Sequence, residues 1–356
     1  MSIYLLYMAS PVWMMFIVEL LFRKSVSKST RAKQIYLTLF AILMTLMIGL
    51  RHYDVGSRDS FFYFTNWETM SSIPAAKLFS HIKQTDLEYG YQIVVWLFSQ
   101  ILPRGQWLFM LSGAFFSYCV CSFVYKNCKN VVLALLVFNC LGIFNFMVQG
   151  LRQSIAMCIC LLSLERIKKH EYWQFFLYVV LACLFHASSA VFLIVPVLCN
   201  FKFSYKSVFL FLLCVTVGIV ILPTVFSLLN IILNDNYNSN SAADSGGGVA
   251  ILIYACVLLF GIVYRDQSSS DFALFFYMTA VAGILMVLRN AYSGIAERVS
   301  YFFAFAEMAV ISNCVYSIKK SNQRLIVSGV IAVLCFGVAI HKAGYSVLVP
   351  YYFFWQ

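Results

Sequence analysis

The stretch FNFMVQGLRQSIAMCICLL, residues 144–162, decides how the rest of the chain is interpreted. It is apolar at both ends and carries Gln149, Arg152 and Gln153 near its centre. An arginine in the middle of a membrane costs at least ~2.5–3.5 kcal/mol, so it either lies near a membrane face or is retained for a function. The positions of the membrane faces therefore decide what Arg152 does.

The composition is typical of a polytopic helical membrane protein. Of the 356 residues, 62% are hydrophobic and 11% are charged, whereas soluble domains carry about 25% charged residues. Apolar runs of membrane-spanning length recur throughout the chain, without the alternating pattern of a transmembrane barrel. The net charge of +11 comes largely from short loops, which indicates a topology signal and argues against nucleic acid as a partner.

We predict an all-α fold with about 12 transmembrane helices in a single domain over residues 1–356. The predicted spans are 3–22, 34–50, 106–125, 131–148, 151–167, 172–186, 187–201, 207–230, 248–264, 272–288, 299–317 and 324–341. One further apolar segment, 87–102, is short and carries Glu88 and Gln92 at one end.

The basic loops decide whether segment 87–102 crosses the membrane. Loop 23–33 holds five Lys and Arg residues, so it is expected in the cytoplasm. If 87–102 does not cross, all the basic loops face the cytoplasm, and together they hold 16 of the 25 Lys and Arg residues: 23–33, 126–130, 165–171, 202–206, 265–271 and 318–324. We therefore predict a re-entrant or interfacial helix over 87–102, with both termini outside.

The outer face then carries a main loop, 51–105, a flexible Asn-, Ser- and Gly-rich loop, 231–247, and the turn 289–298. The spans on either side of Arg152 have roughly 17 residues, or ~25 Å, against a hydrocarbon core of ~30 Å, so their outer ends are expected to form a recess. If the helix continues through Gly150, then Asn145, Gln149 and Arg152 share one face. Arg152 is either a capping or snorkelling residue or part of an anion site, and we favour the anion site.

Other charged residues are expected on the same outer face. Several of them, and the nearby Tyr63, have a structural alternative: His186 as a turn residue, Glu88 as a helix cap, Tyr63 as part of an interfacial aromatic belt, and the 51–59 cluster as a self-neutralising network. Positive-inside bias disfavours arginine on this face, so five such arginines indicate an anionic ligand. The candidates are Arg51, Arg58, Asp59, Tyr63, Glu88, Arg152, His186, Arg289, Glu297 and Arg298.

These residue types suit a lipid-linked sugar pyrophosphate. Guanidinium groups form bidentate contacts with phosphate. A direct displacement of the pyrophosphate also requires a carboxylate or histidine to accept the proton of the attacking hydroxyl. We assign pyrophosphate and substrate binding to Arg51, Arg58, Arg152, Gln149, Gln153, Arg289, Arg298 and Tyr63. The candidates for the base or for acceptor positioning are His186, Asp59, Glu88 and Glu297, with His186 preferred as the base.

The order of these motifs resembles the EpsG-like group of polysaccharide polymerases, relatives of the Wzy O-antigen polymerases. The resemblance covers roughly residues 1–350, and LRQSIA followed about thirty residues later by FHASS is its most specific part. Members of the group more often have Gly-Thr-Asp where this chain has Gly-Ser-Arg-Asp, residues 56–59. The matching stretches are VGSRD, EYGY, GLRQSIA, ERIKKHEYWQFF, FHASSAVFL, AERVSYF and PYYFF.

The resemblance implies a GT-C-like architecture and no metal or other cofactor. It also implies polymerisation of undecaprenyl-pyrophosphate-linked repeats, of O-antigen or a related polysaccharide, at the periplasmic face of a bacterial inner membrane. A chain-length regulator is a common partner of such polymerases. Two alternatives from other classes remain: a flippase for the same lipid, against which no internal repeat is found, and an O-antigen ligase. An acyltransferase with a cytoplasmic donor is less favoured, since His170 is the one histidine expected on that side.

Overall fold

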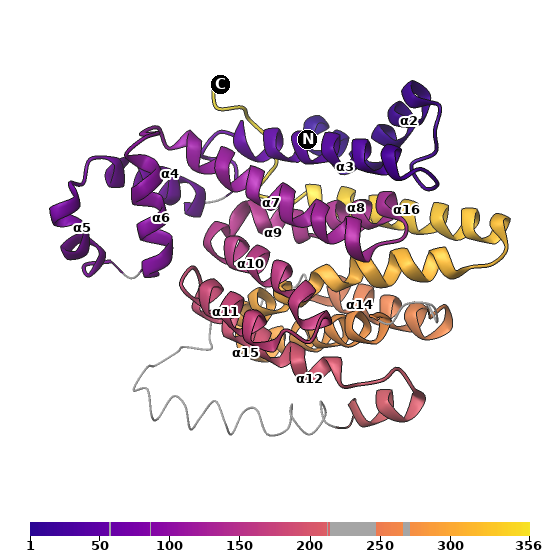
Figure 1. Cartoon of the computed structure of the whole chain (residues 1–356). Coiled ribbons are helices and arrows are strands. Elements are labelled where there is room, and N and C mark those ends of the chain that lie inside the picture. Colours follow the sequence, from indigo (N-terminus) through magenta and orange to yellow (C-terminus); the bar gives the residue numbers. More distant parts are fainter. Residues whose placement is uncertain (57, 86, 212, 214–246, 266–270) are drawn as a thin grey trace.

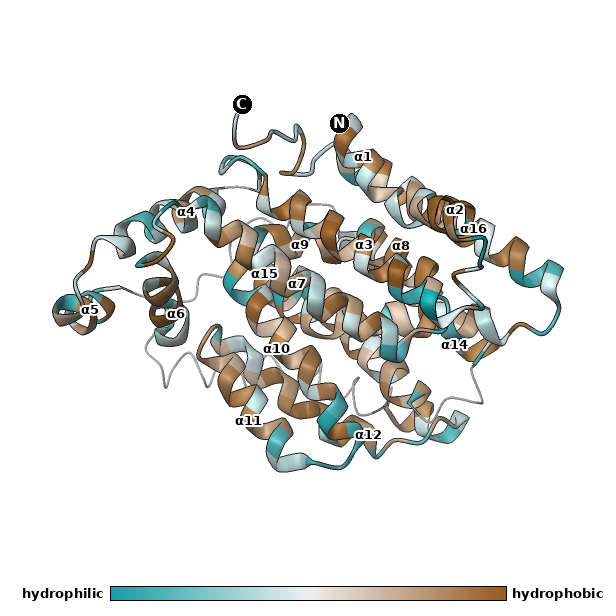
Figure 2. Cartoon of the chain, turned by 45° about the horizontal axis from the view of Figure 1, so that its top comes forward, coloured by the Kyte–Doolittle hydropathy of each residue, from teal (hydrophilic) through white to brown (hydrophobic). Residues whose placement is uncertain are grey.

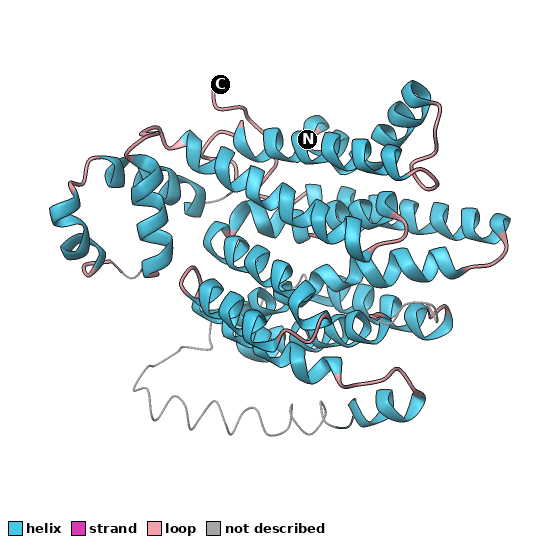
Figure 3. Cartoon of the chain, viewed as in Figure 1, coloured by secondary structure: helices cyan, strands magenta, loops and turns pink. Residues whose placement is uncertain are grey.

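The apolar runs form helices that lie side by side in one bundle (Figure 1, Figure 3). The computed structural model describes residues 1–56, 58–85, 87–211, 213, 247–265 and 271–356, without the side chains of 58, 247 and 290–294. The elements are α1 (Ser2–Met8), α2 (Ser10–Phe22), α3 (Thr30–Gly49), α4 (Arg58–Ser71), α5 (Ala75–Ile82), α6 (Tyr89–Ser99), α7 (Gln106–Asn127), α8 (Val131–Cys140), α9 (Ile143–Gln149), α10 (Leu151–Lys168), α11 (Tyr172–Cys183), the 3₁₀ helix η1 (Ala187–Ile194), α12 (Val195–Cys199), α14 (Gly247–Val263), α15 (Phe272–Ser317) and α16 (Ser321–Ala343).

Several of these helices are long and apolar enough to cross a membrane. Five candidate spans lie among the described residues, or up to seven if each of two bent pairs counts as one span. The bent pairs are α1 with α2, at 62°, and α8 with α9, at 55°. The predicted total of about 12 and the GT-C-like architecture remain predictions. Most of the predicted span 207–230, and all but the last residue of loop 231–247, lie outside the described residues.

Element α15 has 46 residues, which would measure ~69 Å as a straight helix. It cannot be straight, because one glycine of α14 lies against both of its halves. A Cβ placed on Gly261 would be 3.1 Å from Phe276 and 3.4 Å from Val310. The chain therefore folds back between the candidate spans Phe272–Arg289 and Ile295–Ser317. The predicted turn at 289–298 has helical backbone, but it does reverse the chain.

The described residues of the six basic loops lie together at one end of the bundle, loop 265–271 being represented by Arg265 and Asp271. This follows from side-chain contacts that run from loop to loop: Lys33 with Tyr125, Lys168 with Asn127 and Asp271, Arg265 with Phe203, and both Lys129 and Arg324 with Tyr316. Figure 2 shows hydrophilic residues mainly at the helix ends and hydrophobic residues along the helices. The loop distribution expected from the positive-inside rule is thus matched by the three-dimensional arrangement.

Helices α4, α5 and α6 form a lobe at the opposite end of the bundle (Figure 1). Two indole N–H groups hold it together: Trp67 Nε1 donates to the carbonyl of Leu102 at 2.7 Å, and Trp96 Nε1 donates to that of Ile73 at 2.8 Å. Helix α6 has 11 residues, about 16 Å, which is too short to cross a ~30 Å core. It runs across the direction of the bundle helices in Figure 1, as an interfacial helix does.

Candidate functional site

The site begins where the chain breaks at Gly150. Helix α9 ends at Gln149 and α10 starts at Leu151, so the continuous helix considered for this stretch does not form. Asn145 does not share a face with Arg152, because it is buried and donates to the Tyr4 hydroxyl at 3.0 Å. Gln149 is half-buried at the end of α9. The break leaves Arg152 in the first turn of α10, at the end of the bundle that carries the lobe.

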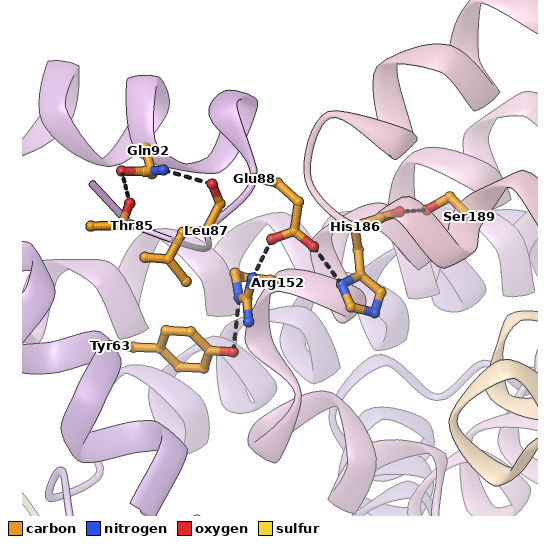
Figure 4. A network of polar contacts seen from close by, with 8 residues as sticks. All are labelled: Tyr63, Thr85, Leu87, Glu88, Gln92, Arg152, His186 and Ser189. Atoms are coloured by element: carbon orange, nitrogen blue, oxygen red, sulfur yellow. Dashed lines mark hydrogen bonds and ion pairs between the residues drawn. The ribbon is translucent and has the colours of Figure 1, made fainter. Parts of the chain in front are cut away.

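Arg152 joins a polar network built from four segments (Figure 4). Its Nη1 forms an ion pair with Glu88 Oε2, and its Nε donates to the Tyr63 hydroxyl at 3.3 Å. The other carboxylate oxygen, Glu88 Oε1, lies 2.9 Å from His186 Nδ1. The side chains of Glu88, Arg152 and His186 are 20%, 23% and 25% exposed. Four predicted candidates are thus linked in one chain of contacts, and the three ionisable side chains are partly exposed, while Tyr63 is buried.

A glycine brings Glu88 to His186. The N–H of Gly90 donates to the carbonyl of Leu184 at 2.9 Å, and a Cβ on Gly90 would lie 2.7 Å from both the Cβ and the oxygen of Leu184. The start of α6 therefore packs directly on the turn between α11 and η1. On the other side, the His186 carbonyl accepts from the Ser189 N–H at 3.0 Å and from its hydroxyl at 2.7 Å, which fixes the histidine backbone.

The charges in this network favour one protonation pattern. Burial raises the pKa of the Glu88 carboxyl, but the hydrogen bond from His186, a backbone hydrogen bond and the charge of Arg152 outweigh it, so the pKa is lowered. An ionised carboxylate only accepts hydrogen bonds. The proton of a neutral His186 therefore sits on Nδ1, which leaves Nε2 with a free lone pair. This is the tautomer that a general base requires.

The reversal of α15 supplies a second group of charged residues. Arg289 Nε pairs with Glu297 Oε2 at 2.9 Å, and both side chains are partly exposed. The Arg298 carbonyl accepts from Gln153 Nε2 at 2.6 Å, while the Arg298 side chain is exposed. Because Gln153 follows Arg152 directly in α10, this hydrogen bond brings Arg298 to the same end of α10 as the Glu88 network. Gln153 itself is only 4% exposed and has a structural role here.

Arg51 is not part of this network, since its side chain is fully buried. Its guanidinium lies 4.2 Å from the ring centroid of Phe109, and Nη1 donates to the Val55 carbonyl at 2.9 Å. Burial lowers the pKa of Arg51 to about 9. Its backbone also forms a β-bridge with Phe353, so Arg51 ties the start of the 51–105 loop to the C-terminal segment. This location is typical of a stabilising residue.

The two remaining candidates lie on α4. The side chain of Arg58 is outside the described part of the chain. Asp59 is exposed in the first turn of α4, and its negative charge acts on Tyr63, four residues later on the same helix. Burial raises the pKa of Tyr63, while Arg152 opposes this shift, so the tyrosine remains a neutral hydrogen-bonding group.

One buried cluster was not identified from the sequence. Glu307, in the second span of α15, is 3% exposed. Its carboxyl group interacts with the Tyr254 hydroxyl and with the charge of Lys342. Lys342 Nζ also donates to the Leu141 carbonyl at 2.7 Å, at the bend between α8 and α9. An ionisable residue within an apolar span is itself a functional signal, and the stretch YFFAFAEMAV, residues 301–310, contains one.

Within the described ranges, no three His, Cys, Asp or Glu side chains come together in a way that could hold a metal ion. Comparisons with curated proteins and with solved structures gave no match. A comparison with family models matched the EpsG family over residues 34–353, which is nearly the whole chain. The matched region includes every segment that contributes to the network of Figure 4. The chain therefore belongs to the EpsG family.

Proposed function

We propose that the protein is a membrane glycosyltransferase that polymerises lipid-linked oligosaccharide repeats for a surface polysaccharide. Family membership supports a polymerase-like role in polysaccharide biosynthesis. The observation that carries the specific reaction is the contact of Glu88 with both Arg152 and His186. It combines a group for binding an anion with a base held in a defined tautomer, and glycosyl transfer from a pyrophosphate needs both.

In this proposal the reaction is a direct displacement. The hydroxyl oxygen of the acceptor repeat attacks the anomeric carbon of the donor glycan, and the bond from that carbon to the pyrophosphate oxygen breaks. The pyrophosphate leaves with the bonding electrons, and the hydroxyl proton passes to Nε2 of His186. Glu88 keeps the proton of His186 on Nδ1 and stabilises the positive charge that the ring gains, because its Oε1 lies 2.9 Å from Nδ1.

The leaving pyrophosphate requires more positive charge than Arg152 supplies, since Glu88 already neutralises that residue. Arg298 provides it, because its side chain is exposed and its backbone is bonded to Gln153. Arg289 is compensated by Glu297 in the same way as Arg152 is by Glu88. Glu297 and the exposed Asp59 are then the candidates for positioning the acceptor sugar. Tyr63 supports Arg152 through its hydroxyl.

The basic loops support the orientation that we propose. Since they lie at one end, the positive-inside rule favours that end in the cytoplasm and the Glu88 network on the outer side. We assign the protein to a bacterial inner membrane with the site facing the periplasm. The donor is an undecaprenyl-pyrophosphate-linked repeat, and a chain-length regulator is the expected protein partner.

The test is a gel of surface polysaccharide from a strain lacking the gene, complemented with wild type, Arg152→Ala or His186→Gln. The null strain should carry anchors capped with one repeat, and only the wild-type gene should restore the ladder. Anchors that carry no repeat at all in the null strain would contradict the proposal and indicate a flippase or a ligase. Membrane levels of each variant, measured by immunoblot, separate loss of activity from loss of protein.

A further inference from the structure

A groove begins one helical turn from Arg152. It has a volume of about 470 Å³ and is lined by α6, α7, α10 and α11, together with Trp67 of α4. On α10 its lining residues are Ile155, Ile159 and Leu162. These follow Arg152 at steps of three, four and three residues, so all four side chains lie on one face of the helix. The groove therefore extends ~10 Å along α10, away from the charged network and toward the end with the basic loops.

The groove also meets the network on its other side. Tyr91, which lines it, packs edge-on against Tyr63 with ring centroids 5.9 Å apart. Phe185, another lining residue, directly precedes His186 in the chain. The lining is mostly aliphatic and aromatic. Two of its residues, Phe98 of α6 and Leu181 of α11, are each 45% exposed, which marks an opening at the bundle surface.

Size alone does not single out this groove. A larger one, about 560 Å³, lies between α3 and α7, but none of the candidate site residues lines it. The groove along α10 differs because a charged site and an apolar channel follow each other on one helix face. A ligand that fills both must carry an anionic group at the end of a hydrocarbon chain.

We propose that this groove holds the first isoprene units of the polyprenyl chain of the lipid-linked donor, with its pyrophosphate at Arg152. The assignment rests on the proposed function for the identity of the lipid. The hydrocarbon chain enters from the membrane between Phe98 and Leu181. The apolar lining keeps the hydrocarbon chain separate from the charged site. Because Arg152 lies on the same helix face, it determines the position of the pyrophosphate at the end of the groove. The groove thereby aligns the bond that breaks with His186.

The test uses a matched pair of leucines on α11. Leu181 lines the groove and Leu177 does not, yet they are 45% and 48% exposed and lie one turn apart. Leu181→Trp narrows the groove, whereas Leu177→Trp enlarges an exposed side chain outside the lining. The probe is a diazirine-tagged polyprenyl pyrophosphate without sugar, added to the full chain in nanodiscs. Crosslinks are mapped by mass spectrometry, and melting temperatures report whether each variant is folded.

In the wild type, we expect label on peptides of α6, α7, α10 and α11, and competition by untagged polyprenyl pyrophosphate. The free-energy cost of overpacking is typically large enough that labelling of Leu181→Trp should fall about fivefold or more. Labelling of Leu177→Trp should match the wild type. Equal labelling of the two variants overturns the proposal. So does equal labelling of the groove by a diazirine-tagged phosphatidylglycerol, because bulk lipid then fills it. Ladder formation by the wild-type gene is scored separately. A protein that forms the ladder but shows no label in the groove therefore disproves the lipid assignment of the groove and leaves the proposed polymerase function standing.

Discussion

Replacing Glu88 by Gln removes the charge at the centre of the network while keeping the side-chain size. The carboxylate of Glu88 accepts hydrogen bonds from two donors, Arg152 on Oε2 and His186 on Oε1. A glutamine has one acceptor oxygen and an NH₂ group that can only donate. One of the two donors is therefore left facing another donor, and the tautomer of His186 is no longer fixed.

The size of the effect follows from the exposure of the three groups. Hydrogen bonds to charged groups contribute about 1.5–3 kcal/mol. Because these side chains are 20–25% exposed, solvent screening favours the lower end of that range, about 1.5 kcal/mol. This corresponds to a rate about tenfold lower. Loss of the base itself in His186→Gln should cost more, on the order of 10²-fold or more.

The assay is polymerisation of a purified lipid-linked repeat by the protein in nanodiscs, with products resolved by length. Glu68→Gln is the matched control: Glu68 is exposed on α4, and its weak contact with the Gly105 N–H at 3.4 Å can be kept by the amide oxygen. If Glu88 acts through His186, adding Glu88→Gln to His186→Gln should cost little more. A Glu88→Gln enzyme with wild-type rate and wild-type abundance would refute the reasoning, as would full additivity of the two changes.

Three further outcomes are expected. The lowered pKa of Glu88 means that its stabilisation is present above the unfolded value of about 4.3 and is lost as pH falls through the lower folded value; the melting temperature of wild type should therefore approach that of Glu88→Gln on acidification. If the gap between the two stays constant with pH, the carboxylate is not the group involved. Gly56 has φ +108°, and its Cβ would meet the Arg51 guanidinium, so Gly56→Ala should destabilise by roughly 1–3 kcal/mol in a thermal melt, whereas Gly337→Ala, with open space around it, should not. Arg152→Lys should leave the ladder largely unrestored, since an ammonium cannot contact Glu88 and a pyrophosphate with a planar fork, and a full ladder would contradict this.

Much of the architecture could be predicted from the sequence because it depends on local properties. Apolar length and loop charge are read along the chain, so the helical fold and the basic end were predictable, while the non-spanning role of 87–102 stays a prediction. Figure 4 joins Tyr63, Glu88, Arg152 and His186, all of which were candidates on the sequence alone. Their residue types and their expected face of the membrane were enough to select them, although not to pair them.

Other features depend on contacts between distant segments, and here the sequence was insufficient. Arg51 and Arg152 look alike as outer-face arginines, yet the first is buried over Phe109 and the second is accessible. No local pattern distinguishes them, because burial is decided by what packs on each residue from elsewhere in the chain.

The sequence by itself determined that this is a helical membrane protein whose charged residues divide between a basic end and an opposite end that carries both signs of charge. The reason is that transfer of each segment into lipid depends on its own composition. Only the tertiary structure decided that Glu88 binds both Arg152 and His186, because that contact requires Gly90 to pack on Leu184, 94 residues away in the chain, at van der Waals distance. Such a contact depends on the complementary shapes of two distant segments, which the hydropathy of the sequence does not indicate.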